Sequence, residues 1–285
     1  MDNLTNQFTN ITGNMGSQFT NLTGNLNSQF QNGMAFVNGD SMVSKVVKVA
    51  LICAILVATI ELGKKIYFKL KKYSLANPWI VKETKDATKR VILEQDPSKD
   101  SAITLKRSEN EFGGLEFTYS MWIFIDNWEY KYGQWKHIMH KGNPSSWPNR
   151  APGIWLHPKK NAIRVYMNTF KNVGEFADIE NIPLNKWFHL TVAVRQRNID
   201  LFINGNIVKR HQLKGIPKQN YGNVYVNAWR GFSGYLSRAK YYDYYISFAE
   251  LDSLVKAGPS TKLPESTSKA NAPPYLPYNW WANSK

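Results

Sequence analysis

The chain has 285 residues, a formal net charge of +15 and a single cysteine. This length allows one good-sized domain with appendages or two small domains, and the uneven composition along the chain favours the first arrangement. One cysteine excludes an intrachain disulfide, and with it the class of small secreted domains that disulfides hold together.

Residues 1–42 form a repetitive Asn/Thr/Gly-rich tail without Lys or Arg. A Gln-Phe pair recurs every eleven residues, at Phe8, Phe19 and Phe30. This period places one apolar stripe along a helix, so we expect the tail to become helical on a partner or a membrane surface, with self-association possible and with these phenylalanines as docking residues. Many Gly, Asn and Thr residues leave a low-complexity spacer as an equal alternative. The glycosylation state of three sequons stays open, at Asn3, Asn10 and Asn21.

Residues 43–62 are predicted to form a transmembrane helix, because twenty helical residues cover about 30 Å, the thickness of the hydrocarbon core. Only residues 49–60 are free of charge, so the span requires Lys45 and Lys48 to extend their amines toward the headgroups. A buried helix of a soluble domain is the alternative. The predicted membrane-facing residues are Val49, Leu51, Ile52, Ile55, Leu56 and Ile60.

A basic run follows the apolar stretch directly. By the positive-inside rule it places the C-terminal domain on the cytosolic face of the membrane and the N-terminus on the translocated side. Such a run also attracts anionic lipid. No cleavable signal peptide is visible, so the span is expected to stay as an anchor. The run comprises Lys64, Lys65, Lys69, Lys71 and Lys72.

Residues 63–107 are expected to form a basic stalk and the first strands of the folded domain. The Asn77-Pro78 step should end the helix that leaves the membrane, because a residue before proline avoids helical geometry. Two short runs favour strands, residues 90–93 and 102–105.

Residues 108–257 show the two-residue period of β-strands, and this spacing predicts a mainly β fold, an antiparallel sandwich. Asn204-Gly205 predicts a tight hairpin turn. Ser247 and Glu250 have the spacing of a capping box, which predicts a short helix to Ala257 with Gly258 as its stop. Strands are expected at residues 115–125, 135–140, 153–157, 161–168, 187–195, 199–204, 207–212, 223–227 and 234–242.

Several motifs in this region carry a resemblance. They are WFHLTVAV at 187–194, DLFING at 200–205, FSGYLSRAKYYD at 232–243 and ISxxEL at 246–251. They resemble the concanavalin A-like superfamily in its laminin-G and pentraxin-like branch, over residues 108–257. Because these are mostly core and turn residues, the resemblance implies a two-sheet jelly roll more than an activity.

The sequence favours a protein without catalytic activity, metal or cofactor. Glycosidases of this superfamily place three carboxylates on one strand face, whereas the spacing of Glu175, Asp178 and Glu180 points Glu175 away from the other two. His137 and His140 are three apart on a predicted strand and are expected to face opposite ways. No Ser/His or Cys/His pairing is evident, and no tight acidic cluster indicates calcium, although relatives use it.

Two aromatic segments are candidates for binding a glycan or a protein partner. Their aromatic and polar side chains could stack on a sugar or anchor a protein interface. The scattered cations of the domain disfavour nucleic acid. The candidate residues are Trp147, Arg150 and Trp155, with Trp229 and Arg230.

Residues 258–285 form a Pro-rich tail that ends in an aromatic motif. The motif is too apolar for a free tail, so we expect it to dock on the sandwich or on a neighbouring subunit. Its docking residues are Tyr275, Tyr278, Trp280 and Trp281.

The overall plan resembles a membrane-anchored minor capsid protein of a large double-stranded DNA virus. In such virions the cytosolic face of the source membrane turns toward the capsid, which agrees with the orientation given by the lysines. The leading hypothesis is therefore a structural protein that tethers an inner membrane to other capsid proteins. A membrane-anchored lectin-like protein and a scaffold on a cellular organelle are the alternatives.

Overall fold

The computed structural model describes residues 39–108 and 114–264, together with a few helical residues between 23 and 35. The chain divides into two compact units, residues 1–71 and 72–285, which are treated separately below. The expected docking residues of both tails lie outside the described residues: Phe8, Phe19, Phe30, Tyr275, Tyr278, Trp280 and Trp281.

A single long helix, α2 (Met42–Ala76), contains the predicted span. Its stretch Met42–Tyr67 is long and apolar enough to cross a membrane, and none of the most apolar window is buried. All six residues predicted to face lipid are exposed side chains of this helix. The alternative of a buried helix in a soluble core is therefore wrong. The helix continues past residue 62 and ends directly before Asn77-Pro78, as the proline predicts.

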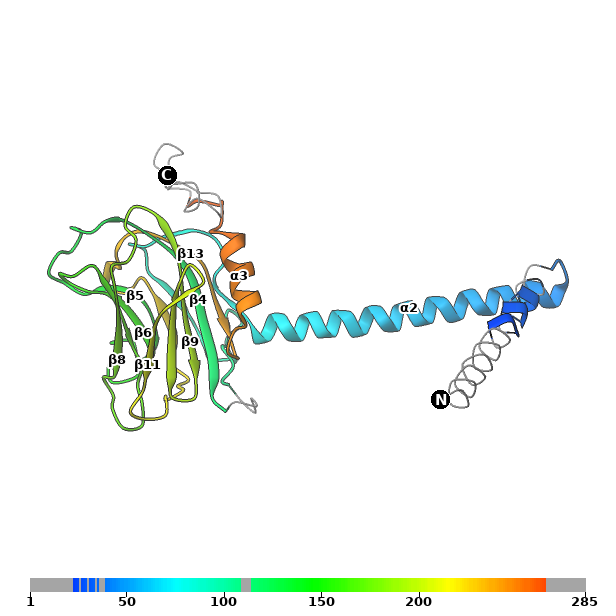
Figure 1. The fold of residues 1–285 in the computed structure, drawn as a ribbon, viewed down its shortest axis with the longest axis horizontal. Coiled ribbons are helices and arrows are strands. Elements are labelled where there is room, and N and C mark those ends of the chain that lie inside the picture. Colours follow the sequence, from blue (N-terminus) through cyan, green and yellow to red (C-terminus); the bar gives the residue numbers. More distant parts are fainter. Residues whose placement is uncertain are drawn as a thin grey trace, which may run out of the picture. The chain divides into compact units, whose positions relative to one another are not determined.

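The second unit is an antiparallel sandwich of a seven-stranded and a six-stranded sheet (Figure 1). The larger sheet has the order β1-β13-β4-β9-β10-β11, with β2 also paired to β13, and the smaller sheet has the order β3-β12-β5-β6-β7-β8. This architecture confirms the mainly β prediction. The strands are β1 (Trp79–Val81), β2 (Lys85–Asp86), β3 (Val91–Leu93), β4 (Glu116–Asn127), β5 (Lys136–Gly142), β6 (Arg150–Leu156), β7 (Ala162–Tyr166), β8 (Phe176–Glu180), β9 (Trp187–Arg195), β10 (Asn198–Ile203), β11 (Asn206–Gln212), β12 (Val224–Val226) and β13 (Ser233–Tyr242).

The core lies between the sheets and follows the alternation of the strands. On β4, Tyr119, Met121 and Ile123 point inward, and Leu190 and Val192 of the paired strand β9 meet them in the same core. The intervening side chains of β4 point to the outer face of the larger sheet. The two-residue period of the sequence therefore predicts which residues form the core and which lie outside it.

The helix α3 (Phe248–Ala257) covers part of the outer face of the seven-stranded sheet (Figure 1). Its Leu251 packs in a small cluster with Phe202 of β10. The capping prediction is confirmed, because the Ser247 side chain accepts a hydrogen bond from the Glu250 amide and Gly258 ends the helix at a φ of 64°.

The structure departs from the expected strands at the start of the domain. Residues 102–105 form no strand, because the Leu105 amide bonds to the side chain of Gln95 at 2.9 Å and so does not join a sheet. The strands β1, β2 and β8 were not among those expected from the sequence. The first two are only three and two residues long, too short for periodicity to reveal.

Substituting Gly234→Ala should destabilise the sandwich by about 2 kcal/mol or more. Gly234 has a φ of +137° where the register between β13 and β4 shifts, and a Cβ there would collide with the Phe124 carbonyl. Gly174→Ala is the matched control, since its Cβ would meet nothing closer than 3.9 Å. Urea denaturation followed by tryptophan fluorescence compares the two. Equal midpoints for both variants would show that the close approach is unimportant.

Candidate binding face on the six-stranded sheet

Aromatic side chains occupy the outer face of the six-stranded sheet. Tyr225, Trp155, Tyr166 and Phe176 alternate with core residues on β12, β6, β7 and β8, so they point away from the core. No α-helix among the described residues covers this side (Figure 1). An antiparallel sheet normally presents polar residues on an outer face. We call this surface the aromatic face.

His137 and His140 both belong to the aromatic face, so the expectation that they face opposite ways is wrong. A β-bulge between His137 and Met139 places two residues of β5 opposite one of β6. The extra residue, Ile138, turns inward with Met139, and the following histidine returns to the outer face. The His137 Nε2 and His140 Nδ1 atoms lie 2.7 Å apart.

Hydrogen bonds define the protonation of both histidines. The Ala228 amide donates to His137 Nδ1 at 2.9 Å, so the neutral ring carries its proton on Nε2 and donates to His140 Nδ1. The Nε2 of His140 then donates to the Asn143 carbonyl at 2.8 Å. Burial lowers the pKa of His137 well below its usual value and that of His140 to about 4, so both rings are neutral at pH 7.

Trp229 is held against these histidines by an unusual backbone. Asn227, Trp229 and Arg230 all have left-handed φ angles, 51°, 51° and 61°, in the short turn η1 (Ala228–Arg230). Such angles are costly for residues with side chains and concentrate at functional sites. The turn stacks the Trp229 ring on His140, 5.7 Å away at 13°, and on Trp155, 5.4 Å away at 20°. Trp229 still remains 46% exposed.

A second stack contains two arginines. The Arg150 guanidinium lies 3.5 Å from the centroid of the Tyr166 ring and 5.5 Å from that of Trp147. The Arg164 guanidinium lies 3.7 Å from the centroid of the Phe176 ring. The structure thus unites the predicted Trp147, Arg150, Trp155 and Trp229 on one face. Arg230 lies at its margin, where its carbonyl accepts a hydrogen bond from Tyr130.

Two buried donors on the aromatic face have no acceptor among the described residues. They are the indole Nε1 of Trp155 and the Nε of Arg150. An unmade hydrogen bond of a buried donor costs about 1–3 kcal/mol, so native proteins rarely leave such groups unpaired. A ligand or partner that brings acceptors to this face would remove that cost.

The other candidate residues from the sequence are dispersed. Asp178 pairs with Arg164, whereas Glu175 is buried and accepts from the Lys214 amide at 2.6 Å. His157 accepts from backbone amides of its own turn, and His211 lies 3.6 Å from Glu175. Among residues 39–108 and 114–264, no group of three or more His, Cys, Asp or Glu side chains is placed to hold a metal ion.

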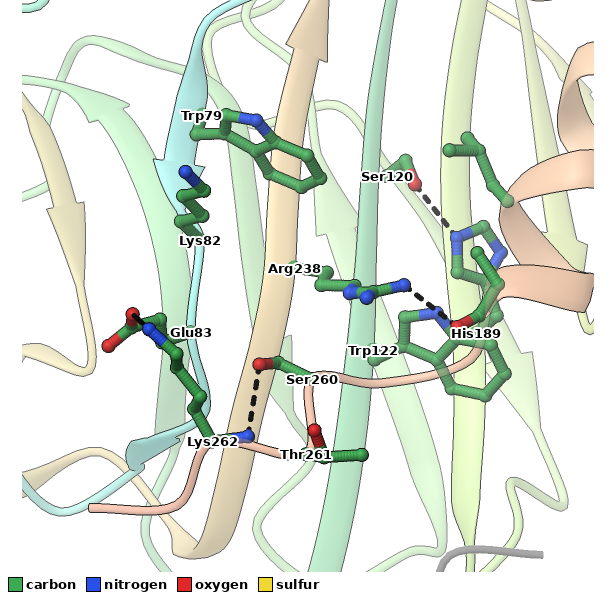
Figure 2. Close-up of a pocket in the computed structure, with 12 residues that line it drawn as sticks. Trp79, Lys82, Glu83, Ser120, Trp122, His189, Arg238, Ser260, Thr261 and Lys262 are labelled. Atoms are coloured by element: carbon green, nitrogen blue, oxygen red, sulfur yellow. Dashed lines mark hydrogen bonds and ion pairs between the residues drawn. The ribbon is translucent and has the colours of Figure 1, made fainter. Parts of the chain in front are cut away.

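A cavity of about 540 Å³ lies on the outer face of the other, seven-stranded sheet. Figure 2 shows Trp79, Trp122 and Arg238 around it, with the Lys262–Glu83 ion pair at one side. It also shows Ser120 directed at His189, and their Oγ and Nε2 atoms lie 2.8 Å apart. The interpretation that no Ser/His pairing exists is therefore wrong. The pair escaped detection because it joins strands β4 and β9, 69 residues apart.

The Ser120–His189 pair has the environment of a structural contact. His189 is 1% exposed, and burial lowers its pKa to about 3, so it would be a weak base at neutral pH. Its other nitrogen lies 3.3 Å from the Thr191 hydroxyl instead of a carboxylate. The segment above the cavity is fixed, because the Thr84 hydroxyl donates to the Ser260 carbonyl and the Ser260 amide donates to Ser237.

Two antiparallel sheets around one core, with loops and an aromatic outer face, define a lectin-like jelly-roll domain. The family model described as the concanavalin A-like lectin/glucanases superfamily matches residues 97–252. The chain belongs to this superfamily. A search of curated proteins gave no match.

Solved structures of low identity are similar to part of the chain. The binding domain of botulinum neurotoxin DC in complex with SialylT is 15% identical, with a TM-score of 0.40 over 49% of this chain and 34% of that one. The serotype D ligand binding domain in complex with N-acetylneuraminic acid is 11% identical, with a TM-score of 0.45 over 58% and 39%. This chain therefore spans well under half of those structures.

Acid should destabilise the sandwich through its neutral histidines. Between the ordinary pKa of 6.5 and the folded value near 4, the unfolded state binds a proton at His140 that the folded state does not. The free energy of unfolding should therefore fall by about 3 kcal/mol from pH 7 to pH 4 for this group alone. Urea denaturation across that range measures it. In His140→Gln the pH dependence should shrink, whereas His157→Gln, at a residue that is only partly buried, should change it little.

Proposed function

We propose that this protein is a non-enzymatic membrane tether. Helix α2 crosses a membrane once, and the aromatic face binds a partner protein. The observation that carries this proposal is the aromatic face itself, where Trp147, Phe176 and Trp229 are exposed beside two buried donors that lack acceptors among the described residues. Soluble proteins expose large apolar patches mainly where they bind something.

The anchor is supported by the exposure of the apolar helix. Val49, Ile52 and Ile55 are each more than half exposed, and water would oppose such a surface. The basic run after the span supports an arrangement with the N-terminus translocated and the sandwich on the cytosolic side.

A protein partner is supported by the composition of the aromatic face. Trp147 is 55% exposed, Trp229 46% and Phe176 41%, and arginines lie between them. Trp, Tyr and Arg are the residues that carry most of the energy at protein interfaces. The rings extend over β5, β6, β7, β8 and β12, a breadth that suits a protein surface better than a small molecule.

Two sites at which catalysis could have been expected support the proposal that the protein is not an enzyme. The Ser120–His189 pair is buried and its histidine is a weak base, and Asp178 is engaged by Arg164. Neither arrangement supplies a base near neutral pH beside an accessible nucleophile.

The specific form of tether that we favour is a minor capsid or virion membrane protein. In that setting the sandwich faces the capsid and links it to an inner membrane. The support is the resemblance of plan, in which a repetitive tail, one span and a binding domain follow each other along the chain.

Glycan binding is the second candidate function, because the Trp229 ring is 46% exposed and is held by stacking on the buried rings of His140 and Trp155, so a sugar could stack on it. Superfamily membership agrees with it. A glycan array probed with the purified full chain separates the two candidates: micromolar binding that Trp229→Ala abolishes would favour the lectin.

The full chain should remain in the membrane fraction after alkaline carbonate extraction, because its apolar helix would be inserted in the bilayer. Replacing Ile52 and Ile55 together by Asp should release it, since each central charge costs about 2.5–3.5 kcal/mol. In intact vesicles, protease should cleave the sandwich from the cytosolic side. Cleavage only after permeabilisation would refute the proposed orientation.

Trp229→Ala should greatly reduce cross-links between the sandwich and its partner in the native assembly, by about tenfold or more if Trp229 is a central anchor. Phe248→Ala is the matched control, because Phe248 is a 71% exposed aromatic residue on α3, outside the aromatic face. Cross-linking mass spectrometry of both variants measures the effect. Equal losses in the two variants would show that the aromatic face is not the interface.

A further inference from the structure

We propose that Arg150 is the anion-binding residue of the aromatic face, and that the partner segment is acidic and places an Asp or Glu carboxylate against the Arg150 guanidinium. This inference rests on the proposed function and specifies the chemistry of the partner.

The position of Arg150 is fixed before any partner binds. Its amide donates to the Asn168 side chain at 2.6 Å, and its carbonyl accepts from the Asn168 amide at 3.2 Å. The guanidinium lies over the Tyr166 ring, 3.5 Å from its centroid, and 5.5 Å from the centroid of Trp147. Gly153 leaves the room for this side chain, since a Cβ there would come within 3.1 Å of Arg150 Cδ. The loss of side-chain entropy on binding is therefore small.

The charge of Arg150 is not compensated within the described chain. No Asp or Glu among the described residues pairs with it, and its buried Nε has no acceptor. Burial lowers the pKa of the guanidinium, the neighbouring Tyr166 acts in the opposite direction, and the positive charge of Arg164 lowers the pKa further. Arginine nevertheless stays protonated in proteins, so a half-buried cation remains without a counter-ion.

Arg164 shows the arrangement that Arg150 lacks. It is stacked on Phe176, and its Nε and Nη2 each donate to one oxygen of Asp178 at 2.7 Å. The aromatic face thus contains one complete unit of ring, arginine and carboxylate, and beside it a second unit without the carboxylate. Bidentate pairing of a planar guanidinium with a carboxylate is the geometry that this second unit can accept.

An acidic protein segment fits the surroundings better than an acidic sugar. Exposed rings lie on both sides of Arg150, with Trp147 in its own loop and Trp229 and Phe176 on other elements. A chain with a central carboxylate and flanking apolar side chains would cover them together. The net positive charge of the protein favours such an acidic segment during association.

The Nε–H signal of Arg150 in ¹H–¹⁵N spectra of the full chain in micelles tests the site without any partner. Sodium acetate should move this signal in a saturable manner, because a carboxylate paired with the other guanidinium nitrogens changes the charge distribution around the buried Nε. The Arg164 signal is the internal control and should stay in place, since its Nε is already bonded to Asp178. An Arg150 signal that does not move, or that moves equally with sodium chloride, would overturn the proposal.

The peptide Ac-Gly-Tyr-Glu-Tyr-Gly-amide and its Gln counterpart then test the class of ligand. The Glu peptide should bind more tightly, and Arg150→Gln should weaken it by about tenfold or more, whereas Lys159→Gln, with the same change of charge, should have less than about twofold effect. Tighter binding of glucuronate than of the Glu peptide would overturn the choice of a protein ligand.

Different results would refute the proposed function and the proposed role of Arg150. If the native cross-links lie elsewhere on the sandwich while acetate still moves the Arg150 signal, the proposed function fails and the anion site stands. If the cross-links map to the aromatic face and acetate leaves the Arg150 signal unchanged, the tether stands and the role of Arg150 is refuted.

Discussion

Two sheets that share one core have two outer faces, and the rest of this domain depends on how each outer face meets its surroundings. A strand buried on one side must present its alternate residues on the other. On the seven-stranded sheet, α3 and the segment after it cover aromatic and polar residues of β4 and β9. On the six-stranded sheet the described chain adds no α-helix, and the aromatic residues stack on one another.

This stacking explains why the aromatic face is ordered although it is uncovered. The His137–His140 bond, the stack on Trp229 and the left-handed turn at residues 227–230 depend on each other. Each ring is held by two or more neighbours, so little freedom remains to be lost when a partner arrives. This packing requires a strained backbone in the turn, and it depends on histidines that stay neutral. A rigid face of this kind suits a permanent attachment more than a rapidly exchanging one.

The sequence was most informative where one interaction decides the structure. The alternation in β4 and β9 predicted the core, and Ser247 with Gly258 predicted both ends of α3. It failed where a backbone irregularity changes the pattern: the bulge at Ile138 brought two histidines to one face, against the strict period of two. The Ser120–His189 contact was also invisible, because strand pairing at long range cannot be deduced from spacing.

The residues of the aromatic face could be predicted only in part, because the pairing of its strands is not visible in the sequence. Trp147, Arg150 and Trp155 stood out by composition, whereas Tyr166 and Phe176 looked like ordinary strand residues until the pairing of β6, β7 and β8 placed them beside the arginines. Outward aromatic positions on successive strands were the available signal. Recognising them requires the register of the sheet as well as the sequence.

Helix α2 and the aromatic face both expose apolar surface, but they suit different surroundings. The side chains of α2 expose apolar surface that only lipid can accept without cost, because it contains few groups for water to bind. The aromatic face exposes the rings of Trp147, Phe176 and Trp229 beside a half-buried arginine, a combination that suits a partner with polar groups better than lipid. The two surfaces therefore favour different surroundings, the helix an apolar one and the aromatic face a partner with polar groups, and this difference is the physical argument for the proposed tether.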